Sequence, residues 1–384
     1  MRILMISDVY FPRVNGVSTS IQTFRRAFEA RGHTVSLIAP DYGQAVDAGE
    51  EVLRIPARQV PMDPEDFMMK RGPIRRLTAM LRERDFDLLH IQTPFVAHYA
   101  GTAIARRLGI PRVETYHTFF QEYLYHYVPF LPRSWMREAA RKFSKWQCNG
   151  VDAVVVPSSA MLAVLRGYGV RSPIQVIPTG LGADRYRPGD GTRFRERVGI
   201  AAERPTLVHV GRVAFEKNIG FLLRMLVRVR ETVPGVLLVI AGEGPARRQL
   251  QREAASLGLA EHVLFVGYLT RDASLSDCYR AADAFVFASN TETQGLVLIE
   301  AMAQGVPVVS TAVRGTKDIL DAGRGALVAD EQVEDFAAKV VAVLGDASLR
   351  TELGGQARAY AREWSEDAFA ERMLGFYRDV IHNA

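Results

Sequence analysis

The sequence has few cysteines and no long apolar run. Its two cysteines, Cys148 and Cys278, are too few and too far apart for a disulfide framework or a zinc site, so we expect packed thiols. No stretch of the 384 residues approaches the roughly 18 consecutive apolar residues of a membrane span. The chain opens on a strand-like run without the parts of a secretory leader, and we expect it to stay in the cytoplasm.

Motifs that would assign several other chemistries are missing as well. The segment 7–18 is too long and too poor in glycine for the dinucleotide fingerprint Gly-x-Gly-x-x-Gly, which disfavours a nicotinamide-dependent oxidoreductase. The sequence has no His-Glu-x-x-His, no closely spaced cysteines and no Asp-x-Asp placed to hold a divalent cation. We therefore expect neither a metal nor another cofactor.

Basic residues are concentrated in the first half of the chain. Residues 1–180 carry 23 Lys and Arg against 16 Asp and Glu, whereas residues 181–384 carry 25 against 27. Such asymmetry is typical of a face that meets nucleic acid, a membrane or an anionic substrate. No recognised nucleic-acid-binding module accompanies the charge, so we expect no nucleic acid partner.

Strand-like and helical segments alternate along the chain, which predicts an α/β fold with parallel sheets covered by helices. Strands are expected at 3–6, 34–39, 51–55, 88–91, 112–116, 153–157, 206–210, 236–241, 263–266, 284–287, 306–309 and 326–328. Helices are expected at 21–31, 101–108, 132–147, 220–231, 246–257, 274–282, 295–304, 333–345, 347–364 and 366–381. A segment rich in Pro and Gly, 177–191, separates two such series, so we predict two doubly wound Rossmann-like domains that face a central cleft.

The stretch 290–310 combines a polar turn, a helix and a buried strand. Glu292 lies in the turn, where free backbone N–H groups and the positive end of the helix dipole favour an anionic ligand. Glu300 lies further along the same helix. A carboxylate beside such a site can accept sugar hydroxyls, which suits a sugar joined to phosphate. The alternative is that Glu292 only starts the helix and Glu300 is a solvated helix residue.

Two other loops are candidates for holding a phosphate group. Asn15-Gly16 forms a turn before a helix that we expect to begin near Ser18, and the Gly16 N–H can approach a phosphate there. The loop 211–217 places Arg212 and Lys217 before a helix, and these cations can hold phosphate oxygens without a metal. An ordinary β-to-α loop and solvated cations are the alternatives.

Two glycine-containing loops and two histidines complete the candidates. Gly242-Glu-Gly-Pro245 lets a ligand approach the backbone, and Val266-Gly-Tyr-Leu269 can receive a flat base. His117 follows a strand and would point into the cleft, although a satisfied loop histidine is the more common arrangement. His90 fits a buried strand position.

The helix expected at 132–147 has an aromatic face beside a basic one. The aromatic face holds Trp135, Met136, Ala139, Phe143 and Trp146. This composition is typical of an interfacial helix on anionic lipid, and the candidate membrane contacts are Arg133, Trp135, Arg137, Arg141, Lys142, Lys145 and Trp146. A second basic run lies at 70–84. The alternative is two packed helices with solvated charged faces.

Taken together and in this order, the motifs resemble those of retaining glycosyltransferases of family four, which have the GT-B architecture. The resemblance covers nearly the whole chain. It implies an acceptor-binding domain at 1–178, a nucleotide-sugar-binding domain at 179–365 and a helix at 366–384 that packs back on the first domain. Gln294 and Thr179 depart from the residues that many members carry, which leaves the identity of the donor open.

The resemblance also implies roles for single residues. The catalytic residues would be His117, Arg212, Lys217 and Glu292. Donor contacts would come from Gly16, Gly211, Gly242, Gly244, Gly267, Tyr268, Leu269, Thr293, Gln294, Gly295, Leu296 and Glu300. Acceptor contacts would come from Asp8, Tyr10, Asn15 and Tyr116.

Such an enzyme would move a hexose, glucose or mannose, from a UDP- or GDP-type sugar to a lipid-linked or glycolipid acceptor. It would be peripheral on the inner face of the cell membrane. The aromatic stretch 116–127 resembles the acceptor loop of members that glycosylate diacylglycerol. The alternatives are the same transfer to a soluble or polysaccharide acceptor, and a non-catalytic protein that binds nucleotide sugars.

Overall fold

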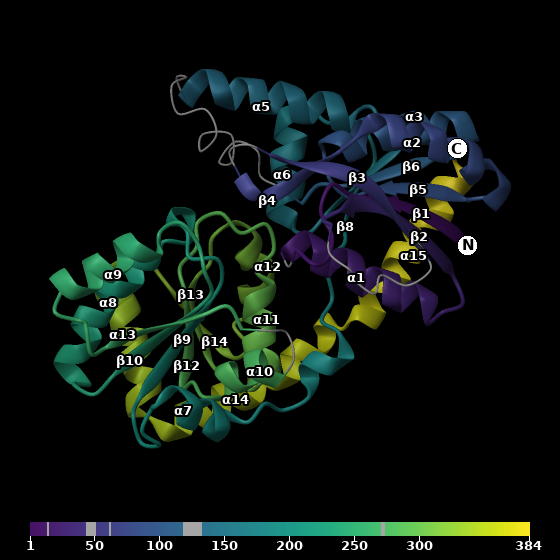
Figure 1. Ribbon diagram of the computed structural model, residues 1–384. Helices are drawn as coiled ribbons and strands as arrows, with labels where there is room; N and C mark the ends of the chain where they lie inside the picture. Colours follow the sequence, from purple (N-terminus) through teal and green to yellow (C-terminus); the bar gives the residue numbers. More distant parts are fainter. Residues whose placement is uncertain (14, 44–50, 61–62, 118–132, 270–272) are drawn as a thin grey trace. The chain divides into compact units, whose positions relative to one another are not determined.

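The chain forms two compact units in a computed structural model that describes residues 1–13, 15–43, 51–60, 63–117, 133–269 and 273–384 (Figure 1). Unit 1 consists of Met1–Gly180 and Glu366–Ala384, and unit 2 consists of Leu181–Ser365. The first crossing between units therefore falls two residues beyond the expected position, after Gly180 rather than residue 178.

The two ends of unit 2 are hydrogen-bonded to each other. The N–H of Leu181 donates to the carbonyl oxygen of Trp364 at 2.7 Å, and Leu181 also forms an isolated parallel bridge with Ser365. The chain therefore enters and leaves unit 2 at one place.

Unit 1 is built on an eight-stranded sheet in the order β4-β3-β2-β1-β5-β6-β7-β8. All its pairs are parallel except β3 with β4. The strands are β1 (Arg2–Ile6), β2 (Thr34–Asp41), β3 (Val52–Val60), β4 (Asp63–Met69), β5 (Leu88–Ile91), β6 (Arg112–Thr115), β7 (Ala153–Val156) and β8 (Ile174–Val176). The helices are α1 (Gly16–Glu29), α2 (Arg71–Leu81), η1 (Arg82–Arg84), α3 (Val96–Leu108), α5 (Arg133–Cys148), α6 (Ser159–Tyr168) and α15 (Glu366–His382).

Alternate residues of the central strands face opposite sides of this sheet, as the pleat requires. Leu89 of β5 packs in one hydrophobic cluster with Ile104 of α3 and Leu165 of α6. The next residue, His90, instead contacts Tyr377 of α15, the C-terminal helix (Figure 1). Tyr377 also packs edge-on against Phe28 of α1, with ring centres 5.8 Å apart. The C-terminal helix thus belongs to the core of unit 1.

Unit 2 is built on a six-stranded parallel sheet in the order β11-β10-β9-β12-β13-β14. Its strands are β9 (Thr206–Val210), β10 (Leu237–Ala241), β11 (Val263–Gly267), β12 (Ala284–Phe287), β13 (Val308–Thr311) and β14 (Ala326–Ala329). Its helices are η2 (Ala183–Tyr186), α7 (Gly191–Val198), η3 (Phe215–Lys217), α8 (Ile219–Thr232), α9 (Arg247–Ser256), α10 (Ala273–Arg280), α11 (Leu296–Ala303), η4 (Arg314–Thr316), α12 (Lys317–Leu320), α13 (Val333–Gly345), α14 (Ala347–Ala361) and η5 (Arg362–Trp364). The expected α/β class with two Rossmann-like sheets is confirmed.

Each sheet has one place where the strand order reverses. In unit 1 the chain runs outward from β1 through β2 and β3, and β5 then pairs on the other side of β1. In unit 2 it runs outward from β9 through β10 and β11, and β12 returns to the other side of β9. Loops that leave the carboxyl ends of two such strands diverge, and ligands of doubly wound sheets bind between them. We therefore expect a ligand site at the loops after β9 and β12 in unit 2, or at those after β1 and β5 in unit 1.

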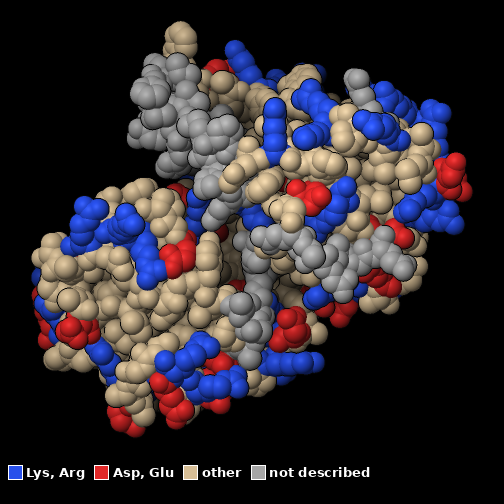
Figure 2. Space-filling view, viewed as in Figure 1, with Lys and Arg blue, Asp and Glu red and all other residues tan. Residues whose placement is uncertain are grey.

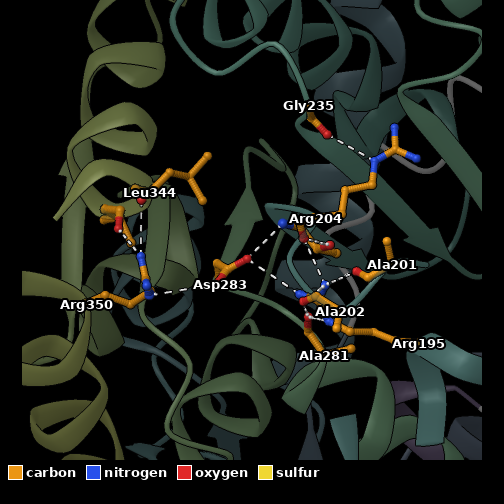
Figure 3. Close-up of polar contacts among 11 residues, drawn as sticks. Arg195, Ala201, Ala202, Arg204, Gly235, Ala281, Asp283, Leu344 and Arg350 are labelled. Carbon is orange, nitrogen blue, oxygen red and sulfur yellow. Dashed lines mark hydrogen bonds and ion pairs between the residues drawn. The ribbon is translucent and has the colours of Figure 1, made fainter. Parts of the chain in front are cut away.

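The amino ends of β9 and β12 are braced by one carboxylate, Asp283 (Figure 3). It accepts a hydrogen bond from the N–H of Thr206 at 2.9 Å, and it lies 3.6 Å from Arg195 and 3.8 Å from Arg350. Arg195 in turn donates to the carbonyl oxygen of Ala281. The amino ends of the two strands that flank the reversal are thus held together by Asp283. The candidate loops lie at the opposite, carboxyl ends of the same strands.

Several elements differ from the sequence-based prediction. The strand expected at 51–55 continues to Val60 and pairs with β4, which was not expected. Helix α3 begins at Val96 rather than at 101, and α6, β8 and α7 were not expected at all. For α6 the local pattern was present, because Ser158 caps its first turn and Gly169 ends it in the left-handed region.

Candidate functional site

The loops after β9 and β12 bring Lys217 and Glu292 together in unit 2. The Lys217 ammonium and the Glu292 carboxylate form an ion pair in which both side chains are mostly buried. These residues are far apart in the sequence and become neighbours because β9 and β12 are adjacent strands. The solvated-cation alternative is thus wrong for Lys217, because its side chain is mostly buried and paired with Glu292.

The backbone around Glu292 is held from behind by the loop after β13. The Gly315 N–H donates to the carbonyl oxygen of Glu292 at 3.1 Å, and a Cβ on Gly315 would overlap the carbonyl group of Thr293. Gly295 then takes the left-handed conformation, with φ +94°, as the N-cap of α11. A Cβ there would lie 2.9 Å from Leu298, so glycine is required for both conformation and space. Glu292 therefore precedes a helix N-terminus of fixed geometry.

The loops after β9, β10 and β11 are joined by backbone hydrogen bonds. Val213 donates to the carbonyl oxygen of Glu243, and Gly242 donates to that of Gly267. A Cβ on Gly242 would overlap the carbonyl oxygen of Gly211. These glycines permit a close approach of three loops, and Tyr268, next to them, leaves 65% of its surface exposed. A flat ligand could stack on that ring.

Glu300 is buried on α11, with only 4% of its surface exposed, so the solvated alternative is wrong. One carboxylate oxygen accepts a hydrogen bond from the Tyr279 hydroxyl at 2.9 Å. The other oxygen, Oε1, has no hydrogen-bond partner within the described ranges. A buried acceptor in this state is suited to a ligand hydroxyl, in keeping with the donor contact predicted for Glu300.

The remaining donor-site predictions in unit 2 lie around this centre. Arg212 is exposed, and Gln294 is buried between Glu292 and α11. Thr293 and Leu296 are partly buried on either side of Gln294 and Gly295. Their contacts with a donor stay predictions.

In unit 1, Asp8 follows β1 and caps a helix that begins after β5. Its carboxylate accepts hydrogen bonds from the Thr93 hydroxyl at 2.8 Å and from the Ala97 N–H at 3.1 Å. Phe95, the N-cap residue of α3, supplies no side-chain cap of its own. Burial raises the pKa of Asp8 to about 6, and the hydrogen bonds from Thr93 and the helix lower it in part.

The other three predicted acceptor ligands also have internal partners. The Tyr10 hydroxyl accepts a hydrogen bond from Arg25 at 3.2 Å, and the Tyr116 hydroxyl lies 2.8 Å from the Ser144 hydroxyl. Asn15 is the N-cap of α1: its side chain accepts from the Ser18 N–H, and the Ser18 side chain accepts from the Asn15 N–H. Helix α1 therefore begins at Gly16, before Ser18 and before the expected helix range 21–31. The acceptor roles stay predictions.

His117 and His90 occupy different settings in unit 1. Nε2 of His117 lies 3.1 Å from the side-chain amide oxygen Oε1 of Gln92, which only accepts, so Nε2 carries the proton. Burial lowers the pKa of His117 to about 4, which keeps the ring neutral near pH 7. His90 is buried in β5 between Tyr377 and Thr115, as predicted for a strand histidine.

Comparison with known proteins identifies the family of the chain. The family model described as Glycosyltransferase Family 4 matches residues 14–185, and that described as Glycosyl transferases group 1 matches residues 190–360. An alpha-monoglucosyldiacylglycerol synthase of Streptococcus pneumoniae is 32% identical over 99% of this chain and 86% of its own length. The chain is a family-four glycosyltransferase.

Other relatives of this glycosyltransferase are consistent with that assignment. A GDP-mannose-dependent alpha-mannosyltransferase of Corynebacterium glutamicum is 28% identical over 99% of this chain and 89% of its own length. The solved structure of a sucrose-phosphate synthase from Thermosynechococcus elongatus covers 100% of both chains with a TM-score of 0.80 and 21% identity. At that identity the likeness concerns the fold, and it confirms the predicted GT-B architecture.

Helix α5 of the glycosyltransferase has two distinct sides. Met136, which we expected on the aromatic face, is buried, and so is Ala140, which belongs to the hydrophobic core cluster of unit 1. Trp135 and Trp146 lie outside and leave 74% and 60% of their surfaces exposed. The predicted basic residues Arg137, Arg141, Lys142 and Lys145 are exposed as well, whereas the side chain of Arg133 lies outside the described residues.

No helix within the described residues is long and apolar enough to cross a membrane. In the described part of the enzyme, no three His, Cys, Asp or Glu side chains are grouped so that they could hold a metal ion. Independence from metals stays a prediction, which an assay with a chelator can test.

Proposed function

We propose that this glycosyltransferase moves a hexose, glucose or mannose, from a UDP- or GDP-type sugar to a lipid-linked or glycolipid acceptor, with retention of configuration. The names of its relatives support the substrate classes, because one is a monoglucosyldiacylglycerol synthase and another a GDP-mannose-dependent mannosyltransferase. The aromatic stretch 116–127, on which the acceptor prediction also depends, lies mostly outside the described residues.

The observation that carries the proposal is the Lys217–Glu292 ion pair next to the N-terminus of α11. An ammonium has three N–H donors, so Lys217 can bind a phosphate oxygen while it remains paired with Glu292. Glu292 keeps an acceptor oxygen for a sugar hydroxyl, and the helix N-terminus favours negative charge. Cation, carboxylate and helix end together match a sugar that carries a diphosphate.

The charged groups around the donor suit a transfer in which the leaving diphosphate itself accepts the proton of the acceptor. The bond between the anomeric carbon and the β-phosphate oxygen breaks, and the acceptor hydroxyl oxygen bonds to the same carbon from the same face. Its proton passes to the departing phosphate oxygen, so no separate base is required. Lys217 and Arg212 stabilise the charge that develops on the leaving diphosphate. The neutral ring of His117 would hydrogen-bond the sugar.

Attachment to an anionic membrane would occur through α5. Trp135 and Trp146 are eleven residues apart, which is close to three helical turns, so they share one face about 16 Å apart. Lys142 and Lys145 lie between them on the exposed side of the helix. Interfacial Trp rings and cations that each contribute about 1 kcal/mol at an anionic surface suit reversible attachment. Figure 2 shows further Lys and Arg side chains over unit 1, in the region of α2 and α3.

Product analysis tests the transfer. Purified enzyme is incubated with UDP- or GDP-linked glucose or mannose and with diacylglycerol, glycolipid or soluble sugar acceptors. We expect nucleoside diphosphate release that depends on a lipid acceptor, and an α-linked product from an α-linked donor by NMR. A β-linked product would contradict retention, and turnover with soluble acceptors alone would move the acceptor out of the lipid class.

Vesicle sedimentation tests the membrane surface. The protein should sediment with anionic vesicles and not with neutral ones, and added salt should weaken the binding. Changing Trp135 and Arg141 together to Glu should abolish binding, while turnover on a detergent-dispersed acceptor is retained. Arg248→Glu, an exposed charge change on α9 of unit 2, is the matched control and should leave sedimentation unaltered. Equal binding to neutral vesicles would contradict this part of the proposal.

A further inference from the structure

His209 is a histidine of β9 that none of the roles above uses. Its side chain is completely buried, and it lies two residues before Gly211, where the loop to Lys217 begins. The ring stacks on Phe287 of β12 with centres 5.5 Å apart, and its Nδ1 lies 3.2 Å from the carbonyl oxygen of Val286. Two contacts with β12 therefore fix the ring across the strands that flank the reversal of unit 2.

The contact with Val286 determines where the proton of the ring lies. A carbonyl oxygen only accepts, so Nδ1 carries the hydrogen and Nε2 presents a lone pair. Burial lowers the pKa of His209 to about 4, so the ring keeps this neutral form near pH 7. Nε2 is a buried acceptor that has no hydrogen-bond partner among the residues described. Such unpaired buried atoms are rare in folded proteins, so Nε2 is suited to accept a hydrogen bond from a group that moves when a ligand binds.

Lys217, at the far end of the loop that begins beside Nε2, is the candidate for that donor. A Cβ on Gly211 would lie 3.6 Å from Nε2, so this atom faces the backbone at the start of the loop. The charges of the ion pair also act on the ring, because Lys217 lowers the pKa of His209 and Glu292 raises it. His209 therefore lies within electrostatic reach of both members of the pair.

We propose that His209 is a positioning residue whose Nε2 accepts a hydrogen bond from the Lys217 ammonium when a donor binds. Of the three N–H groups of this ammonium, one is directed at Glu292 in the present structure. A diphosphate takes the second and Nε2 takes the third, so that the cation is held from the protein side and directed at the leaving phosphate. The inference rests on the proposed function, because a diphosphate must draw Lys217 into this arrangement.

Kinetics of His209→Phe and His209→Gln test the inference. Phe keeps a flat ring against Phe287 but removes the acceptor, whereas Gln offers an amide oxygen near the place of Nε2. We expect His209→Phe to lower kcat about ten-fold with little change in the donor KM, and His209→Gln to recover most of that loss. Thermal unfolding of His209→Phe should show a Tm close to that of the wild type, because removal of an unpaired buried polar atom offsets the loss of the Nδ1–H bond to Val286.

A double-mutant cycle with Lys217→Ala shows whether His209 acts through Lys217. In the Lys217→Ala background, His209→Phe should have no further effect on kcat, because the acceptor has already lost its donor. Effects that multiply in the double variant would overturn the inference. So would a His209→Phe enzyme with wild-type kcat, or one in which only the donor KM changes.

The same double-mutant cycle can be measured by diphosphate binding, which requires no turnover. Calorimetry with UDP or GDP, whichever binds the wild type, should show that His209→Phe weakens diphosphate binding several-fold in the wild-type background, because the free diphosphate carries the full leaving-group charge that the donor lacks. The same change should have no effect beside Lys217→Ala. Independent losses would again overturn the inference. Failure of the proposed function is recognised separately, by the absence of sugar transfer from the wild-type enzyme.

Discussion

Replacement of Asp8 by Asn should make the stability of unit 1 less dependent on pH. The pKa of Asp8 is raised from 3.8 to about 6 by burial, so the folded protein binds this proton more tightly than the unfolded chain does. The stabilising contribution of the protonated form is therefore complete below pH 4 and is lost as pH rises through 6. At about 1.4 kcal/mol for each pKa unit, ionised Asp8 costs roughly 3 kcal/mol at neutral pH.

The asparagine variant keeps the shape and the capping contact but cannot ionise. Its amide oxygen can still accept from the Ala97 N–H, as either oxygen of Asp8 does now. Subtracting the unfolding free energy of Asp8→Asn from that of the wild type cancels the titration of every other carboxylate. Linkage predicts that this difference falls by about 2 kcal/mol between pH 4.5 and pH 7.5.

Denaturation with urea, followed by tryptophan fluorescence, measures the effect. The experiment uses a Trp364→Phe background, because Trp135 and Trp146 then report on unit 1 alone. Parallel pH profiles of the two proteins, or a difference that grows as pH rises, would refute the reasoning. The first outcome would mean that α3 and Thr93 stabilise the carboxylate enough to offset its burial.

The other predictions concern the donor site. Glu292→Gln should reduce transfer greatly while the fold stays intact, since it removes charge at the sugar and no core packing, and the Tm should fall only by the loss of the ion pair with Lys217. Wild-type-like turnover would contradict the assigned role. Lys217→Ala and Arg212→Ala should each lower kcat on the order of 100-fold if they stabilise the leaving diphosphate, whereas a loss confined to donor affinity would restrict them to binding. EDTA should leave the rate unaltered, and a need for magnesium or manganese at saturating substrates would contradict the role given to these two cations.

The sequence predicted most elements of both sheets, because buried parallel strands have strong apolar runs. It missed the first turn of α3 because the cap comes from Asp8, on a strand that is distant in sequence, and Phe95 gives no local capping pattern. By contrast, α7 was readable: Asp190 caps its start and Gly199 ends it in the left-handed region. The capping pattern of α7 was therefore present in the sequence, and the prediction overlooked it.

The candidate site could be predicted in part for a related reason. Spacing indicated Glu292 and Lys217 separately, but their pairing depends on the strand order of unit 2, which local patterns do not reveal. The same holds for His209, whose lone pair becomes significant only when Val286 of the adjacent strand fixes the ring. Tyr10 is a further example, because the hydrogen bond that its hydroxyl accepts from Arg25 could not be foreseen from the local sequence.

In chain order, unit 2 is an insertion between the two segments of unit 1, and the hydrogen bond between Leu181 and Trp364 joins the two ends of this insertion. Residues 181–365 begin and end at neighbouring points, so this segment could be excised without pulling its ends apart, and it should bind a nucleotide alone. The insertion also sets the order in which the two units are completed during synthesis on the ribosome. Unit 2 is complete while Glu366–Ala384 is still to be made, so unit 1 must wait for α15 before its core, including the contact of Tyr377 with His90, can close.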